Sequence, residues 1–119
     1  MSNIELIDDN NLKCRFAIFK NANLKLASGE VLKNFKLAFN TFGSLNENKT
    51  NAILICHALT GDQYVTGHNP ITGKDGWWAR MVGPDKPIDT NKFFVICSNV
   101  LGGCAGSTGP KEKNESGQD

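Results

Sequence analysis

The stretch from Asn51 to Asp62 holds the residues best placed to do chemistry. Five apolar residues, 52–56, end abruptly in His57, and the loop that follows is made mainly of small and polar residues. A continuous apolar run of this length is typical of a parallel strand buried on both faces. In open α/β sheets the chemistry gathers at the carboxyl ends of such strands. The pattern therefore predicts a buried strand that delivers loop backbone N–H groups to a site.

A serine nucleophile would complete such a site, and the chain contains one near match to the G-x-S-x-G motif. Residues 105–109 place Ser107 at the nucleophile position, with Ala105 where the motif has its first glycine. The motif needs a strand before the serine and a helix after it. Here a glycine-rich loop precedes the serine, and Pro110 and polar residues follow it. We therefore expect Ser107 to be a loop residue and the chain to contain no nucleophile, acid or base of a catalytic triad.

Other polar and aromatic residues leave alternatives open. His57 is either a general base or a residue that fixes the loop by hydrogen-bonding neighbouring backbone. His68 falls in a polar stretch typical of a surface loop, so we expect it to be solvated. The adjacent Trp77 and Trp78 either line a substrate cavity or anchor a short helix on the core.

The four cysteines, at positions 14, 56, 97 and 104, form no Cys-x-x-Cys pair. Two of them, Cys56 and Cys97, lie inside apolar runs, where cysteine behaves as a small hydrophobic residue. Adjacent strand residues point to opposite faces, so Cys56 and His57 are badly placed to share one ion. We expect reduced core thiols and no metal site.

Two half-buried strands are predicted before the buried one. Apolar and polar residues alternate over 12–18 and again over 35–39, which is the pattern of a strand with one solvated face. Residues 27–30, Ala-Ser-Gly-Glu, are typical of a turn. We expect these two strands to form an antiparallel hairpin at the edge of the sheet.

A second buried strand is predicted over 93–97, parallel to the one over 52–56. Parallel strands require a crossover connection, and residues 76–82 are the best candidate for a short helix within it. The predicted fold class is α/β.

Several blocks of sequence in a fixed order resemble the homoserine O-acetyltransferase family, over roughly residues 12 to 110. These blocks are His57 to Asp62, Gly76 to Trp78, Met81 to Pro84, Ile88 to Thr90, Phe94 to Cys104 and Gly106 to Pro110. The resemblance implies the N-terminal part of an α/β-hydrolase fold, with an edge hairpin, parallel central strands and an incomplete sheet. We expect residues 1–119 to be a single partial domain of a longer protein. Its N-terminal extension would be 1–11 and its polar, truncated end 111–119.

The resemblance also implies an activity. The whole enzyme would transfer acetyl from acetyl-CoA to a serine and then to the homoserine hydroxyl, through an acyl-enzyme, in methionine biosynthesis. The nucleophile and the catalytic histidine of the family would lie outside this chain, which we expect to be inactive alone. The resemblance therefore implies a structural role for His57.

The family's oxyanion hole implies specific site residues in this chain. Leu59 would donate its backbone N–H to the oxyanion, and the second donor would follow the missing nucleophile. Thr60, Asn99, Gly102 and Gly103 would shape the acyl and homoserine pocket. Acetyl-CoA would be a co-substrate, with no bound cofactor, and the full-length enzyme would be a homodimer.

Composition narrows the class of partner. The net charge is +1, with acidic and basic residues interspersed, so nothing indicates nucleic-acid or membrane binding. No signal peptide or membrane span is predicted, so we expect a cytoplasmic protein. Three alternatives remain: an esterase, a serine- or succinyl-transferring relative, and a short non-catalytic protein.

Overall fold

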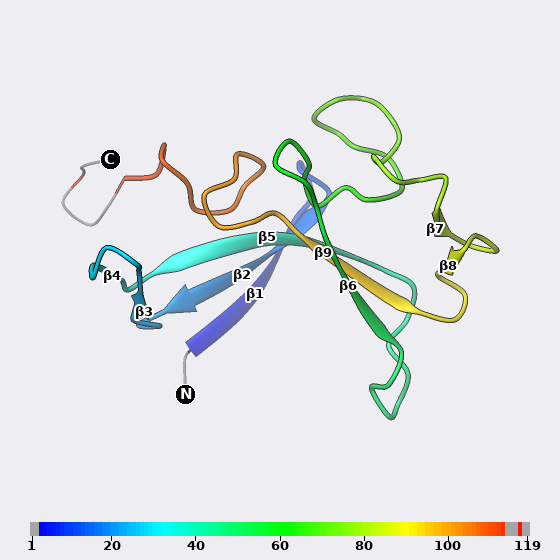
Figure 1. Cartoon of the computed structure of the whole chain (residues 1–119), viewed down its shortest axis with the longest axis horizontal. Coiled ribbons are helices and arrows are strands. Elements are labelled where there is room, and N and C mark those ends of the chain that lie inside the picture. The colour runs from blue at the N-terminus through cyan, green and yellow to red at the C-terminus, as the bar shows by residue number, and fades with distance from the viewer. Residues whose placement is uncertain (1–2, 114–116, 118–119) are drawn as a thin grey trace.

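The computed structural model describes residues 3–113 and 117, and its main feature is a five-stranded mixed sheet (Figure 1). The strands lie in the order β1-β2-β5-β9-β6. Their bounds are β1 (Asn3–Asp9), β2 (Cys14–Lys20), β5 (Phe35–Phe42), β9 (Phe94–Ser98) and β6 (Ala52–Cys56). Two small ribbons accompany the sheet, formed by β3 (Leu24–Lys25) with β4 (Val31–Leu32) and by β7 (Val82–Gly83) with β8 (Ile88–Asp89).

The predicted antiparallel pairing of the two half-buried strands is confirmed, but their expected place at the edge of the sheet is wrong, because β1 lies outside β2. β2 pairs antiparallel with β5, with Ala17 opposite Leu37, and the predicted turn lies between β3 and β4. Residues 3–9, expected as part of an extension, form β1, which pairs with the outer side of β2. Its acidic residues obscure the strand pattern. Asp8 forms an ion pair with Arg15 across the two strands, in which Nε of Arg15 donates to Oδ1 of Asp8 (2.9 Å).

The predicted parallel pair is also confirmed. β6 pairs in parallel with β9, with Leu54 opposite Ile96. The expected burial of β6 on both faces is wrong, because β6 is the last strand of the sheet and the Leu54 side chain is 64% exposed. β9 lies between β5 and β6, and its Val95 and Cys97 are fully buried. The described part of the chain provides no strand to cover the outer side of β6.

The short helix expected over 76–82 is wrong, since this segment consists of turns that lead into β7. The N–H group of Trp77 donates to the carbonyl of Tyr64 (3.1 Å). The N–H group of Trp78 donates to the carbonyl of Val65 (2.9 Å). These bonds hold the start of the segment beside residues 64–65. The bonds that follow, such as that from the N–H group of Met81 to the carbonyl of Trp78 (2.9 Å), close turns and do not build a regular helix. No helix that could span a membrane occurs within the described residues.

Two hydrophobic clusters form the core, and the residues that directly follow the loop 57–62 contribute to both. One consists of Ile55, Val65, Val82, Val95 and Cys97, and the other of Cys14, Phe16, Ala38 and Tyr64. Tyr64 and Val65 are neighbours in sequence but belong to different clusters. The segment that follows the loop 57–62 is therefore firmly held, which fixes the far end of that loop.

Candidate functional site

The site is built from two loops that leave the carboxyl ends of neighbouring parallel strands. We call residues 57–62, which follow β6, the strand-end loop, and residues 99–109, which follow β9, the glycine loop. The two loops touch, because the N–H group of Val100 donates to Nε2 of His57 (3.2 Å). This contact sits at the end of the sheet where open α/β folds carry their chemistry.

Leu59 lies at the tip of the strand-end loop. The N–H group of Gly61 donates to the carbonyl of Ala58 (2.8 Å), which closes a turn around Leu59. The Leu59 side chain is 97% exposed. No described residue accepts a hydrogen bond from its backbone N–H, so that donor is available to a ligand. Thr60 beside it is also exposed.

Asp62 anchors the far end of the strand-end loop through its backbone and its carboxylate. Its carbonyl accepts from the Trp77 indole Nε1 (2.9 Å) and from the Cys97 thiol (3.5 Å). Its Oδ1 accepts from the N–H group of Tyr64 (2.9 Å). Trp77 stacks on Trp78 with ring centroids 5.9 Å apart. Trp77 thus braces the loop, and Trp78 packs against the core.

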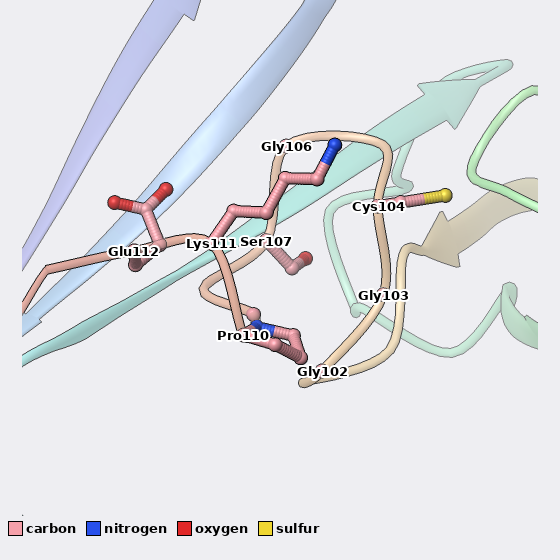
Figure 2. A pocket seen from close by; sticks show the side chains of 9 residues that line it. Gly102, Gly103, Cys104, Gly106, Ser107, Pro110, Lys111 and Glu112 are labelled. Atoms are coloured by element: carbon pink, nitrogen blue, oxygen red, sulfur yellow. The ribbon is translucent and has the colours of Figure 1, made fainter. Parts of the chain in front are cut away.

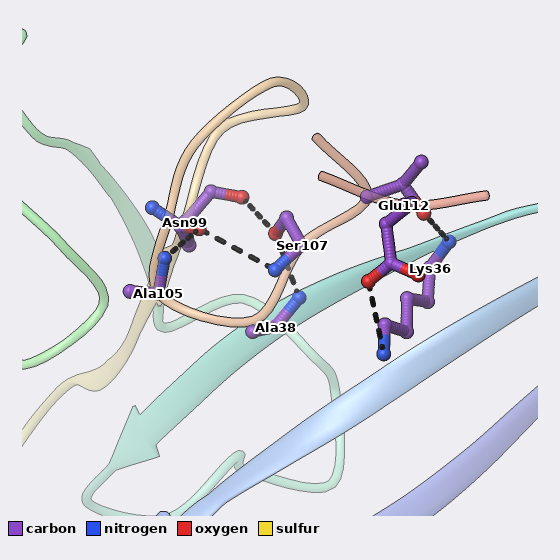
Figure 3. A network of polar contacts seen from close by, with 7 residues as sticks. Lys36, Ala38, Asn99, Ala105, Ser107 and Glu112 are labelled. Carbon is purple, nitrogen blue, oxygen red and sulfur yellow. Dashed lines mark hydrogen bonds and ion pairs between the residues drawn. The ribbon is translucent and has the colours of Figure 1, made fainter. Parts of the chain in front are cut away.

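Asn99 organises the glycine loop from within (Figure 3). Its side chain is buried, and its Oδ1 accepts from the N–H groups of Ala105 (3.1 Å) and Ser107 (3.4 Å). A further buried amide, Gln63, donates from Nε2 to the carbonyl of Ala105 (2.8 Å). Gln63 was not identified from the sequence, because a glutamine in a polar stretch carries no signal of burial.

Ser107, the serine of the near-match motif, is buried between the glycine loop and β5 (Figure 3). Its hydroxyl donates to the carbonyl of Asn99 (2.6 Å) and accepts from the N–H group of Ala38 (2.9 Å). No histidine or carboxylate is among its hydrogen-bond partners in the described chain. This geometry suits a structural serine and gives the hydroxyl no general base.

A cavity of about 420 Å³ lies against the glycine loop (Figure 2). Its walls are Gly102, Gly103, Cys104, Gly106, Ser107, Gly109, Pro110, Lys111 and Glu112. Two of the four pocket residues expected from the sequence, Gly102 and Gly103, thus line it. Thr60 and Asn99 do not, because Thr60 projects from the other loop and Asn99 is turned into the protein. Leu59 is not part of this cavity either.

The buried thiols are poor nucleophiles. Burial raises the pKa of Cys97 to about 12, with smaller contributions from Asp62 and Cys56. Burial is also the main cause of the raised pKa of Cys14 and of the Tyr64 hydroxyl. Both thiols therefore stay protonated at neutral pH. Cys56, expected as a core thiol, is exposed because it lies on the edge strand β6, and Cys104 is also exposed. The described residues contain no cluster of His, Cys, Asp or Glu suited to a metal ion.

Curated proteins of one name match most of the chain. A homoserine O-acetyltransferase from Pelagibacter ubique is 65% identical over 91 residues, which make up 76% of this chain and 24% of that protein. One from Acidiphilium cryptum is 59% identical over 96 residues, or 81% of this chain and 25% of that protein. The chain thus spans about a quarter of the length of these relatives. No family model matches the chain.

Solved structures share the arrangement of strands. A homoserine O-acetyltransferase from Bacillus anthracis superposes with a TM-score of 0.71 and 26% identity, covering 100% of this chain and 30% of that one. An acetylester hydrolase from Corynebacterium glutamicum gives a TM-score of 0.62 and 28% identity, covering 94% of this chain and 30% of that one. The chain is therefore a homologue of homoserine O-acetyltransferases over about a quarter of their length, and its sheet is part of an α/β-hydrolase fold.

Proposed function

We propose that this chain supplies the oxyanion loop of an enzyme that transfers acetyl from acetyl-CoA to the hydroxyl of homoserine. The observation that carries the proposal is the 65% identity to a curated homoserine O-acetyltransferase over 91 residues. A match of that length in a chain of 119 residues must include the strand-end loop. The wider setting we propose is a cytoplasmic homodimer that acts in methionine biosynthesis without a bound cofactor.

The proposed role of Leu59 follows from the chemistry of acyl transfer. Attack of a serine hydroxyl on the thioester carbonyl places negative charge on the carbonyl oxygen, and a fixed N–H donor aimed at that oxygen lowers the barrier. One such donor is worth about 10²- to 10³-fold in rate. The free N–H group of Leu59, on a turn held at both ends, suits this task. The nucleophile and the second donor would come from residues outside this chain.

The pocket residues have different proposed roles. Thr60, which is exposed beside Leu59, would contact the acyl group or the acceptor. Gly102 and Gly103 would form the wall of the cavity on the glycine loop. Asn99 would act indirectly, since its buried amide holds the loop backbone that forms that wall.

Ester hydrolysis is the second candidate function. The acetylester hydrolase from Corynebacterium glutamicum is 28% identical to this chain, slightly more than the 26% of the Bacillus anthracis acetyltransferase. Both reactions pass through an acyl-enzyme and need the same oxyanion donors. They differ in the group that accepts the acyl chain, which is water in one and an amino-acid hydroxyl in the other.

A chimera tests the proposal with this chain's own residues. The chain replaces the matching quarter of the Pelagibacter ubique protein, whose 65% identity favours a compatible fit. We expect the chimera to transfer acetyl from acetyl-CoA to homoserine faster than it transfers acetyl to serine. The same reaction should also be faster than transfer from succinyl-CoA and faster than hydrolysis of a simple acetyl ester. The 119-residue chain alone should be inactive. Ester hydrolysis without acetyl transfer to homoserine would favour the second candidate. Turnover by the chain alone would contradict the proposal that the nucleophile comes from residues outside this chain.

A further inference from the structure

We propose that His57 and Asn99 form a latch that positions the Leu59 donor by tying the strand-end loop to the glycine loop. The inference rests on the proposed function for its effect on catalysis, but its geometry is independent of that function. His57 and Asn99 are the residues that immediately follow β6 and β9. A latch between them holds the first residues of both loops in a fixed relation.

The orientation of the Asn99 amide is fixed by backbone groups. Its Oδ1 accepts from two N–H donors, those of Ala105 (3.1 Å) and Ser107 (3.4 Å). Because two donors face one end of the amide, that end must be the oxygen. The Nδ2 group therefore faces His57, at 3.4 Å from its Nε2.

The same reasoning assigns the tautomer of His57. Its Nε2 faces two donors, the Val100 N–H (3.2 Å) and the Asn99 amide (3.4 Å), so it must be an acceptor without a proton. Its Nδ1 lies 2.6 Å from the carbonyl of Ala58 and must therefore donate. The contacts thus assign Nδ1 of His57 as the donor and Nε2 as the acceptor.

Two glycines leave room for the latch residues. A methyl group on Gly61 would lie 2.7 Å from Cβ of His57. A methyl group on Gly103 would lie 2.5 Å from Nδ2 of Asn99. Each glycine comes four residues after the latch residue that it contacts, so each loop folds back onto its own latch residue. The close packing holds both side chains in place.

The latch explains how the backbone N–H of Leu59 is held in place although the Leu59 side chain is exposed. Leu59 makes no side-chain contact that could hold it, as its exposure of 97% indicates. Its position is set by the residues on either side, His57 through the latch and Asp62 through Trp77. Loss of either anchor would move the N–H donor while leaving the sheet intact. A shift of about 1 Å in such a group can cost on the order of 10²-fold in rate.

Variants of His57 in the chimera test the latch. His57→Phe keeps a ring but removes the acceptor, whereas His57→Gln keeps an acceptor on a side chain of similar reach. We expect His57→Phe to lower kcat by roughly 10- to 100-fold with KM little changed. We expect His57→Gln to restore most of the activity. His68→Gln, a change at the exposed second histidine, is the matched control and should match the parent.

Hydrogen exchange gives a readout that does not depend on activity. The Val100 amide has His57 as its acceptor, so its exchange should be slow in the parent and in His57→Gln, and fast in His57→Phe. Unchanged Val100 exchange in folded His57→Phe would overturn the latch whether or not the chimera turns over. Unchanged kcat with faster exchange would overturn its role in catalysis. A parent chimera without acetyl transfer but with the expected exchange pattern would count against the proposed function and leave the latch supported.

Discussion

At the scale of single residues, hydrogen-bond partners separate a structural serine from a nucleophile. Ser107 matches most of a nucleophile motif in sequence, yet its hydroxyl bonds to backbone groups of Asn99 and Ala38. In Ser107→Ala these two buried groups lose a partner, which costs about 1–3 kcal/mol for such groups. We expect the chimera to lose stability by that order in denaturant unfolding, while the folded protein keeps its turnover.

The matched control for this variant is Ser28→Ala. Ser28 is exposed, and its hydroxyl accepts a single bond from the Glu30 N–H (3.3 Å). Its removal should change stability by less than about 0.5 kcal/mol. Loss of turnover in a folded Ser107→Ala protein would contradict the structural assignment and make Ser107 a nucleophile after all.

The sequence limits what can be said about His57. Its place at the end of an apolar run leaves both a base and a loop anchor open, and the resemblance to a family favours the anchor. Its partners, Val100 and Asn99, are more than 40 residues away in sequence. Only the pairing of β6 with β9 brings them to the ring. The contact could not be predicted from local sequence, because it depends on a long-range register.

At the scale of elements, the apolar sequence of β6 predicts a more buried environment than the strand has in the structure. Its five apolar residues predict burial on both faces, but the described chain leaves the outer side of β6 unpaired and Leu54 exposed. An uncharged apolar edge strand is a template for pairing with another copy. β1, at the opposite edge, carries acidic residues that make the same pairing unfavourable.

We therefore expect the 119-residue chain to self-associate through β6. Leu54→Lys places a charge on this edge and should shift the chain toward monomer in sedimentation velocity. Leu45→Lys is the matched control, since Leu45 is also exposed but lies in the loop before β6. It should leave the association unchanged. A parent chain that stays monomeric at all concentrations would contradict this prediction.

The segment 76–82 illustrates a second limit at this scale. Its tryptophans and its place between two parallel strands favour a helix, but backbone bonds to Tyr64 and Val65 hold its start beside those residues, and the rest forms turns. Gly76 fits closely there, because a methyl group on it would lie 2.4 Å from Cα of Thr66. Such long-range backbone pairing leaves no periodic trace in the sequence, so local patterns favour the wrong element.

At the scale of the whole molecule, the sheet order could be predicted in part. Two apolar runs predict the parallel pair, and alternation predicts the antiparallel pair, as β6–β9 and β2–β5 confirm. The antiparallel pairing of β5 with β9, which joins the two pairs into one sheet, had no local signal. The result is a sheet that carries two loops at one end, in a chain that covers 30% of a solved homoserine O-acetyltransferase.

The central claim is that the backbone N–H of Leu59, in the setting of the whole enzyme, stabilises the oxyanion. Leu59→Pro in the chimera deletes that donor, whereas Leu59→Ala keeps it. The comparison requires that both variants keep the circular dichroism and thermal stability of the parent. We predict that kcat for acetyl transfer to homoserine falls by about 10²-fold or more in Leu59→Pro and stays near the parent value in Leu59→Ala. Equal activity of the two folded variants would contradict the account.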